Sequence, residues 1–341
     1  MAKRGAQVRF KGRLVLLGFG VVGQAVAPLL LRHLGLKPDK LTVVKASEDK
    51  TGIAAELGIE VIVAQLDEGN HIAVLEPLLG KGDFLLNLSV DVSSLALIKL
   101  CRRLGAFYLD TCNEPWGGRY DDPSLPLSRR SNYALREEML AFRLDKRTGP
   151  TAVVTQGANP GLVSALVKQA LLNIAADVHV QVEPPESYED WAALARKLEI
   201  KVIHIAERDT QSSRQGKARD EFVNTWSVHG FVDEGLQPAE LGWGVHERHW
   251  PADAKRHGFG SDAAIYLRQP GIGTRVRSWT PLEGPYHGFL ITHAESISIA
   301  DHLSLRKDGE VVYRPTVHYA YHPCDDAVLS LHELAGKNWQ L

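Results

Sequence analysis

A glycine-rich turn close to the N-terminus constrains the fold of this chain more than any other feature. Leu14 to Leu17 is an apolar run of strand length, and Gly18-Phe-Gly20-Val-Val-Gly23 follows it directly. Apolar residues then recur with helical spacing from Val21 to Leu34, before Gly35. A strand, the spacing G-x-G-x-x-G and a helix together favour a dinucleotide-binding turn, because the glycines let backbone N–H groups approach a pyrophosphate. The alternative is a tight turn that holds no ligand.

Strand patterns alternate with helix patterns along the first half of the chain. We expect further strands at 41–44, 61–63, 83–87, 107–110 and 151–154, and further helices at 52–57, 72–79, 94–104, 132–144 and 162–175. Such alternation is typical of a parallel sheet with helices on both faces. The prolines and glycines of residues 114–127 predict a loop instead. We therefore predict a Rossmann-type, doubly wound α/β domain over residues 1–176.

The pattern changes after about residue 177. Alternating apolar and polar residues, typical of strands, occur at 178–182, 201–205, 221–228, 288–299 and 311–321. These segments predict a second, α+β domain at residues 177–341 with a mixed or antiparallel sheet.

Composition excludes several classes of protein. Lysine plus arginine is 39 and aspartate plus glutamate is 41, so the net charge of −2 disfavours bulk electrostatic capture of nucleic acid. The apolar stretch from Leu14 to Leu31 contains glycines, a glutamine and a proline, which argues against a membrane span or a signal peptide. Three scattered cysteines, Cys101, Cys112 and Cys324, cannot build a disulfide framework and suggest a reducing cytoplasm.

Polar residues at the predicted strand ends are the candidates for cofactor binding. The strand at 41–44 ends in Lys45, where an acidic residue usually binds the ribose; Glu48 and Asp49 follow, and Lys45 could instead suit a 2′-phosphate. We predict NAD. Asn87 follows another strand, although an Asx turn would also explain it. The candidate cofactor-binding residues are Gly18, Gly20, Val21, Val22, Gly23, Asn87, Ser89, Asp110 and Thr111.

Histidine is concentrated late in the chain, with ten of the fourteen beyond residue 228. His318 and His322 have a spacing that suits a metal on a helix, but the flanking prolines predict a strand. Residues four apart on a strand are separated by about 13 Å, too far for one metal ion. His246 and His249 lie in a polar loop. We therefore predict no metal site.

Several long and unusual sequence blocks resemble the bacterial homospermidine synthases. They extend over essentially the whole chain and comprise residues 110–117, 131–136, 157–164, 203–210, 222–228, 234–243, 275–281, 284–293 and 314–328. The chain resembles the saccharopine dehydrogenase-like reductases more distantly.

The resemblance implies a reaction on putrescine, with spermidine as a possible second donor. NAD takes a hydride from an amine-bearing carbon, a second amine attacks the resulting imine, ammonia leaves, and the new imine is reduced by the NADH just formed. It also implies a homodimer and a longer chain. Family members continue past Leu341, with a part expected to return to the nucleotide-binding domain and to add an active-site aspartate.

The resemblance also assigns roles to residues in this sequence. Trp226 would hold the cationic amine, and a desolvated cation over an indole gains up to about 2 kcal/mol. From the residues alone, Trp226 could be a core residue, Glu207 a surface charge and Asn159 a helix cap. The candidate catalytic residues are Glu234, Glu207, Trp226 and His293, and the candidate substrate-binding residues are Glu114, near the pocket entrance, and Asn159.

Two other functions fit the same sequence features. One is an NAD(P)-linked reductase of the saccharopine or carboxynorspermidine dehydrogenase type, which would turn over its cofactor. The other is an inactive NAD-binding relative, which would bind without forming product.

Overall fold

The computed structural model describes residues 8–49, 51–120, 122–145 and 148–338. The chain divides into two compact units, which are residues 1–119 with 138–157 and residues 120–137 with 158–341. They are called the first and the second unit below. Among the helices of the described residues, none combines the length and the apolar character that a membrane span requires.

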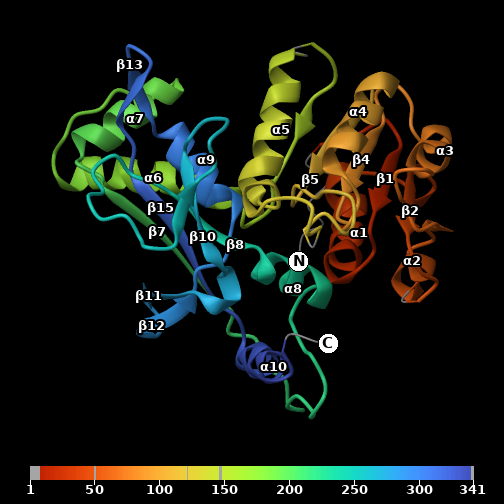
Figure 1. Ribbon diagram of the computed structural model, residues 1–341. Helices are drawn as coiled ribbons and strands as arrows, with labels where there is room; N and C mark the ends of the chain where they lie inside the picture. The colour runs from red at the N-terminus through yellow and green to blue at the C-terminus, as the bar shows by residue number, and fades with distance from the viewer. Residues whose placement is uncertain (1–7, 50, 121, 146–147, 339–341) are drawn as a thin grey trace. The chain divides into compact units, whose positions relative to one another are not determined.

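The first unit contains a parallel sheet of six strands in the order β3-β2-β1-β4-β5-β6 (Figure 1). Its strands are β1 (Leu14–Leu17), β2 (Leu41–Lys45), β3 (Glu60–Val63), β4 (Phe84–Asn87), β5 (Phe107–Asp110) and β6 (Ala152–Val153). The strand order reverses between β1 and β4. Sheets of this kind bind ligands beyond the carboxyl ends of the strands at such a reversal.

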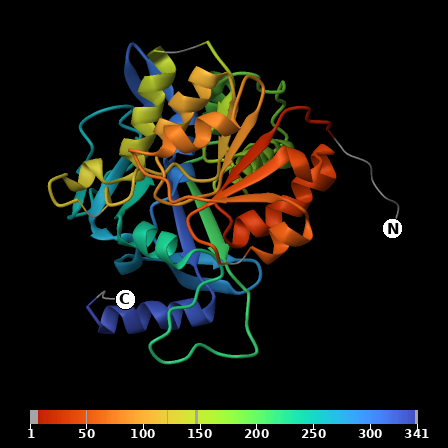
Figure 2. The same ribbon diagram turned by 90° about the vertical axis from the view of Figure 1, so that its right-hand side faces the viewer.

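Helices cover both faces of this sheet (Figure 2). They are α1 (Val21–Leu34), α2 (Gly52–Glu56), α3 (His71–Leu75), α4 (Ser94–Leu104) and the later part of α5 (Asn132–Asp145), with short 3-10 helices at Pro38–Lys40 and Glu76–Leu78. Leu14 and Leu16 pack with α1 and α2, whereas Val15 and Leu17 pack with α3 and α4. Because successive side chains of a strand point to opposite faces, β1 is buried on both sides. The predicted doubly wound sheet is confirmed.

The second unit is built on a seven-stranded mixed sheet with the order β11-β12-β15-β8-β10-β9, in which β7 pairs with β15. Its strands are β7 (Val202–Arg208), β8 (Pro238–Gly242), β9 (Ala254–Arg256), β10 (Ala264–Pro270), β11 (Arg275–Thr280), β12 (Gly284–Phe289) and β15 (Thr316–His322), and a separate hairpin consists of β13 (Leu305–Lys307) and β14 (Glu310–Tyr313). The pair of β7 and β15 is parallel, and the other neighbours are antiparallel. The predicted second domain with a mixed sheet is confirmed.

Among the described residues, the second unit contains five α-helices in addition to the start of α5. They are α6 (Leu162–Asp177), α7 (Tyr188–Lys197), α8 (Val228–Leu236), α9 (Ala294–His302) and α10 (Asp325–Gly336), with 3-10 helices at Leu127–Arg129 and Gly271–Gly273. Apolar residues of α6 to α10 pack with β7, β12 and β15 in one core cluster around Phe231 and Phe289. The division into units places α6 in the second unit. The boundary predicted from the sequence lies between residues 176 and 177, so it assigns all of α6 except its last residue to the first domain.

Four strand segments predicted for the second unit are wrong in whole or in part. The segment 311–321 contains two strands, β14 and β15, which belong to different sheets. Residues 178–182 form no strand, because His179 has a φ of 56° and the Val180 N–H returns to the Ala175 carbonyl. Residues 221–227 form a loop, and at 228 the helix α8 begins. In the segment 288–299, β12 ends at residue 289 and a helix follows from residue 294. In the segments 178–182 and 221–227, apolar residues pack on the core without a neighbouring strand; these are Val180, Val182, Phe222 and Trp226.

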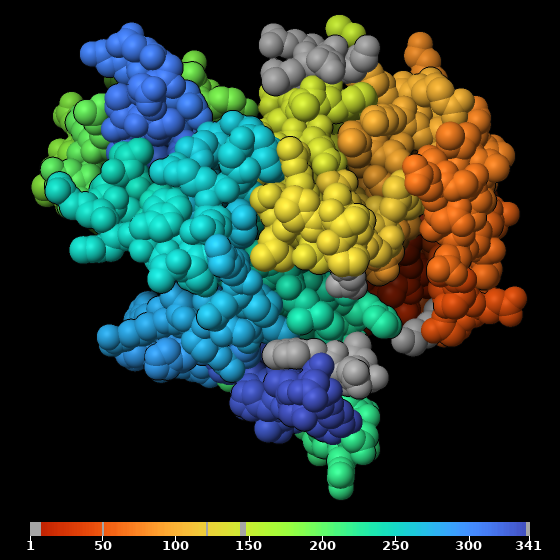
Figure 3. Space-filling view, in the orientation of Figure 1, coloured from red at the N-terminus to blue at the C-terminus, as the bar shows by residue number. Residues whose placement is uncertain are grey.

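The loop between β7 and α8 runs along α10 at one end of the second unit (Figure 3). Lys217 forms an ion pair with Glu333, and the Asp220 N–H donates to Glu333 Oε1 at 2.8 Å. These contacts pull the pKa of Glu333 down to about 2, with the Lys217 hydrogen bond as the largest cause. The middle of the loop is therefore fixed to α10.

Candidate active site

The three glycines of the strand-to-helix turn have different surroundings. A Cβ at Gly18, where φ is 89°, would lie 2.6 Å from the Leu88 carbonyl oxygen, and a Cβ at Gly23 would lie 2.4 Å from the Gly18 carbonyl oxygen. A Cβ at Gly20 would meet nothing within 4 Å. Gly18 and Gly23 therefore permit close backbone packing, while Gly20 leaves open space in front of α1.

The start of α1 is suited to an anionic ligand. Gly20 is the N-cap residue and supplies no side-chain hydrogen bond to the helix. The first N–H groups of a helix have no partner within the helix, and they carry a partial positive charge. The side chains of Val21 and Val22 that follow are 63 % and 47 % exposed. The turn thus has the shape and the donors that a dinucleotide pyrophosphate requires.

The polar residues at the ends of β4 and β5 form a hydrogen-bonded network. Asn87 Oδ1 accepts from the Ser89 N–H at 3.1 Å and from its hydroxyl at 2.6 Å, which is the Asx-turn alternative. Asn87 Nδ2 donates to the Tyr108 hydroxyl at 3.3 Å, and that hydroxyl donates to Asp110 Oδ2 at 2.8 Å. Asn87 and Asp110 are buried, whereas Ser89 and Thr111 are partly exposed.

Asp110 serves the fold through its side chain. Its Oδ1 accepts the Thr155 N–H at 2.6 Å, and the side chain is inaccessible to solvent. Burial raises the pKa of Asp110 to about 6, against the lowering effect of the hydrogen bonds from Thr155 and Tyr108. A ligand at this edge of the sheet would meet the hydroxyl groups of Ser89 and Thr111 rather than this carboxyl group.

Lys45, at the end of β2, is buried, and its ammonium group already contacts Asp49. Its Nζ lies 3.3 Å from Asp49 Oδ1 and also donates to the Asp49 carbonyl oxygen. Glu114 lies in the first unit too, where its backbone N–H donates to Ser94 Oγ at 3.1 Å.

The other predicted substrate-side residues all belong to the second unit, and four of them converge. Glu207 lies near the end of β7, where Asn159 Nδ2 donates to its Oε2 at 2.5 Å. His293 precedes α9, and its Nε2 lies 3.5 Å from Oε1 of Glu234 on α8. His293 Nδ1 pairs with Glu295, whose carboxyl group is almost wholly buried. We refer to Glu207, Glu234, Glu295 and His293 as the acid cluster.

The pairing of β7 with β15 brings a tyrosine into this cluster. In the parallel register, Tyr319 stands opposite Ile205 and Tyr321 opposite Glu207. The Tyr319 hydroxyl donates to Glu207 Oε2 at 3.0 Å. Burial raises the pKa of Tyr319, and the nearby glutamates raise it further, so the phenol stays a donor.

Burial and neighbouring charges shift the pKa values of Glu234 and His293 in the acid cluster by different amounts. Burial raises the pKa of Glu234 to about 7, although the positive charge on His293 works in the opposite direction. Burial opposes protonation of His293, but Glu295, then Glu234 and Glu207, outweigh burial and raise its pKa to about 9. At neutral pH the cluster therefore holds a protonated imidazole beside a carboxyl group that gains and loses a proton readily.

Trp226 packs with aromatic residues of the second unit. Its ring lies 5.7 Å from that of Phe231, which in turn lies 5.9 Å from Tyr321. Tyr321 is buried, which raises its pKa, and a hydrogen bond with Trp226 partly offsets this effect. The half-buried indole is thus both a core residue and a neighbour of the strand that carries Tyr319.

Sequence reasoning missed two members of this arrangement. Glu295 lies two residues after His293, and Tyr319 lies between His318 and His322, but no sequence pattern assigns either residue a role. Asn159 is no helix cap, because Gly161 occupies the N-cap of α6; its Oδ1 is buried and has no hydrogen-bond partner in the described part of the chain. His318 and His322 lie on a strand, as predicted, and His318 contacts His204.

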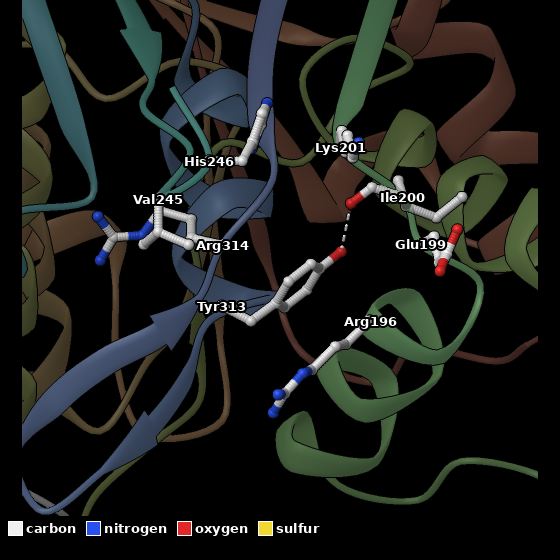
Figure 4. A pocket seen from close by; sticks show the side chains of 8 residues that line it. All are labelled: Arg196, Glu199, Ile200, Lys201, Val245, His246, Tyr313 and Arg314. Atoms are coloured by element: carbon white, nitrogen blue, oxygen red, sulfur yellow. Dashed lines mark hydrogen bonds between the residues drawn. The ribbon is translucent and has the colours of Figure 1, made fainter. Parts of the chain in front are cut away.

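A separate pocket of about 250 Å³ lies elsewhere in the second unit and is lined by none of the predicted site residues (Figure 4). The residues around it are Arg196, Glu199, Ile200, Lys201, Val245, His246, Tyr313 and Arg314. The Tyr313 hydroxyl donates to the Ile200 carbonyl oxygen at 2.7 Å, which ties the two sides of the pocket together.

Comparison of this chain with known proteins identifies its family. The family models of the saccharopine dehydrogenase NADP binding domain and the saccharopine dehydrogenase C-terminal domain match residues 14–153 and 157–340. A homospermidine synthase of Blastochloris viridis is 54 % identical over 332 residues, which is 96 % of this chain and 70 % of the relative. The chain belongs to the homospermidine synthase family. The family predicted from the sequence blocks is thus confirmed.

Two further homospermidine synthases are similar to this chain. A homospermidine synthase of Mesorhizobium japonicum is 50 % identical over 331 residues, which cover 95 % of this chain and 68 % of that one. The crystal structure of the Legionella pneumophila homospermidine synthase in complex with NAD matches with a TM-score of 0.90 at 48 % identity, over 98 % of this chain and 70 % of that chain. Saccharopine dehydrogenase (L-Glu forming) of Saccharomyces cerevisiae shares the fold, with a TM-score of 0.51, 12 % identity and coverage of 96 % of this chain and 58 % of that chain.

Proposed function

We propose that this chain makes homospermidine from putrescine by NAD-dependent aminobutyl transfer, with release of ammonia through imine intermediates. The observation that carries the proposal is the acid cluster, in which three carboxyl groups surround one imidazole in a member of the homospermidine synthase family.

The strand-to-helix turn fits the cofactor. The open space at Gly20 and the N–H groups of Val21 and Val22 would receive the pyrophosphate, with Ser89 and Thr111 as further polar contacts. When bound, NAD supplies the acceptor and the donor of the hydride. Lys45 is already paired with Asp49, which supports NAD over NADP, because this ammonium group is not free to bind a 2′-phosphate. Titration of the protein with both dinucleotides tests this preference.

The acid cluster suits a diamine because putrescine carries two positive charges. Glu207 and Glu234 bind the ammonium groups, and Asn159 holds Glu207 in place. Trp226 supplies an aromatic face for a desolvated cation. Glu114, in the first unit, is proposed to bind substrate near the entrance.

Two members of the cluster move protons. An amine has to be neutral before its carbon can give up a hydride, so a base is needed near neutral pH. Glu234 takes that proton on Oε1, because its pKa lies at about 7. His293, with a pKa of about 9, is the protonated donor for the departing ammonia. The buried position of the cluster limits hydrolysis of the imine.

Other features remain part of the proposal. Spermidine is a second aminobutyl donor, the active form is a homodimer, and the protein works in the cytoplasm. Light scattering of the purified protein measures the oligomeric state directly.

Incubation of the protein with putrescine and a catalytic amount of NAD tests the main proposal. Homospermidine and ammonia without net NADH are the expected products. Accumulation of NADH would identify a reductase of the saccharopine or carboxynorspermidine dehydrogenase type. Binding of NAD without any product would identify an inactive relative.

A further inference from the structure

A second group of buried polar residues lies next to the acid cluster in the chain and has no part in the reaction proposed above. Glu240 of β8 and His257 have wholly buried side chains, with His257 Nε2 3.0 Å from Glu240 Oε1. The His257 ring stacks on that of Tyr133, with 3.9 Å between the ring centroids and an interplanar angle of 15°. Within the described residues, neither Glu240 Oε1 nor the two ring nitrogens of His257 have a hydrogen-bond partner, and burial of unpaired polar groups costs stability. The pair therefore calls for another explanation.

The second oxygen of Glu240 connects the pair to the active-site segment. Glu240 Oε2 accepts the Thr292 hydroxyl at 2.7 Å and the Tyr133 N–H at 3.4 Å. Asn132 Nδ2 donates to the same Thr292 hydroxyl at 3.3 Å. Thr292 is inaccessible to solvent. Its hydroxyl is thus held by β8 and by the start of α5 together.

Thr292 immediately precedes His293, the imidazole of the acid cluster. Residues 290–293 connect β12 to α9 and are neither strand nor helix. His293 is the N-cap residue of α9, with extended backbone angles of −148° and 136°. The place of its ring therefore depends on how the preceding residue is anchored. A displacement of about 1 Å in a catalytic group can cost about 100-fold in rate.

We propose that Glu240 is a positioning residue for His293 and acts through the hydroxyl of Thr292. This role in catalysis rests on the function proposed above, while the positioning itself does not. Four groups face the imidazole: Glu295 of α9, Glu234 of α8, Glu207 of β7 and Tyr319 of β15. A shift of the ring away from these glutamates removes the attraction that keeps it protonated.

Thr292→Val is the variant that tests the proposal, because it removes the hydroxyl and keeps the volume. NMR titration of the labelled histidine side chains should show the pKa of His293 lowered by about one unit. The turnover number should fall about 10-fold or more, with KM for putrescine changed by less than about twofold. Thr292→Ser, which keeps the hydroxyl, should restore both quantities.

Thr316→Val is the matched control. Thr316 is also a buried threonine of the second unit, and its hydroxyl donates to Glu247 Oε1 at 2.5 Å. This variant should lower Tm as Thr292→Val does but leave the His293 titration unchanged. Glu240→Gln is a second variant, in case Thr292→Val does not fold, and it should move the His293 titration in the same direction.

An unchanged His293 titration in folded Thr292→Val or Glu240→Gln would overturn the proposal, whatever happens to Tm. The titration needs no turnover. A parent protein that makes no homospermidine but shows the shift in Thr292→Val would refute the proposed function and leave the positioning role intact.

Discussion

The imidazole of His293 lies nearly parallel to the phenol ring of Tyr319, with 4.2 Å between the ring centroids and an interplanar angle of 25°. This stacking, together with the Glu295 contact at Nδ1, turns Nε2 toward Glu234. The same tyrosine donates its hydroxyl to Glu207. Tyr319 thus joins the proposed proton donor and the proposed ammonium-binding carboxylate through one side chain.

Substitution of Tyr319 should separate these two contacts. Tyr319→Phe keeps the stacking and removes the hydrogen bond to Glu207, so we expect KM for putrescine to rise about 3- to 10-fold while the turnover number changes little. Tyr319→Leu removes both and should also lower the turnover number. Steady-state kinetics of the two variants measure this difference; identical kinetic constants for them would contradict it.

The pH profile of turnover should be bell-shaped. Activity should rise as Glu234 loses its proton near pH 7, a pKa raised by burial and by Glu295 and Glu207. It should fall as His293 loses its proton near pH 9, where the glutamates hold its pKa in spite of burial. Glu234→Gln should remove the lower limb and lower turnover sharply, with NAD still bound. A parent profile flat between pH 6 and 10 would rule out both proton-transfer roles.

The raised pKa of His293 also predicts a pH dependence of stability. The folded protein holds this proton more tightly than the ordinary histidine pKa of 6.5 implies, so the contribution to folding is complete below that pH. It is lost as the pH rises through about 9. Urea unfolding of the parent and of His293→Gln should therefore show a difference at pH 6 that shrinks by pH 10. A constant difference would speak against a protonated His293.

Two alanine variants should distinguish the glycines of the turn. Gly20→Ala adds a Cβ in open space, so the fold should be kept while the dissociation constant for NAD rises about 10-fold. Gly23→Ala adds a Cβ 2.4 Å from the Gly18 carbonyl oxygen and should lower Tm by several degrees. Calorimetric titration with NAD and thermal unfolding check the pair. Unchanged NAD binding by Gly20→Ala would remove the turn from the cofactor site.

Trp226→Ala should weaken diamine binding. Loss of a cation–π contact of up to about 2 kcal/mol corresponds to an increase of up to about 30-fold in KM, with a sharp loss of turnover and with NAD still bound. Trp226→Phe keeps an aromatic face, so its KM and turnover number should lie between those of the parent and those of Trp226→Ala. The control is Trp279→Ala, because Trp279 is an exposed residue of β11. Equal kinetics for Trp226→Ala and the parent would assign the indole to the core alone.

Local sequence signals predicted the first unit closely. The bounds of α1 and α4 match the expected 21–34 and 94–104, because Gly35 and Gly105 end these helices in the left-handed conformation and Ser93 caps the second. The strand at 107–110 also has its predicted bounds. Buried parallel strands are continuous apolar runs, and here short, glycine-bounded connections separate them, so the sequence pattern leaves few alternative positions for each strand and helix.

The second unit and its site depend on contacts that no local pattern contains. Residues 178–182 and 221–228 alternate like strands only because one side of an irregular chain faces the core. Of the candidate site, Glu207, Glu234 and His293 came from the family resemblance, and their catalytic roles stay predictions. Glu295 and Tyr319 join them through the register of β7 with β15 and the start of α9, which only the folded chain reveals.

The parallel pairing of β7 and β15 also sets an order on biosynthesis. The strands meet across a sequence separation of 114 residues, as between His204 and His318. A ribosome must therefore release the polypeptide beyond Tyr319 before Glu207 can receive its phenolic partner. Until then, any nascent chain lacks the assembled cluster, while the glycine turn and its flanking helix emerged long before.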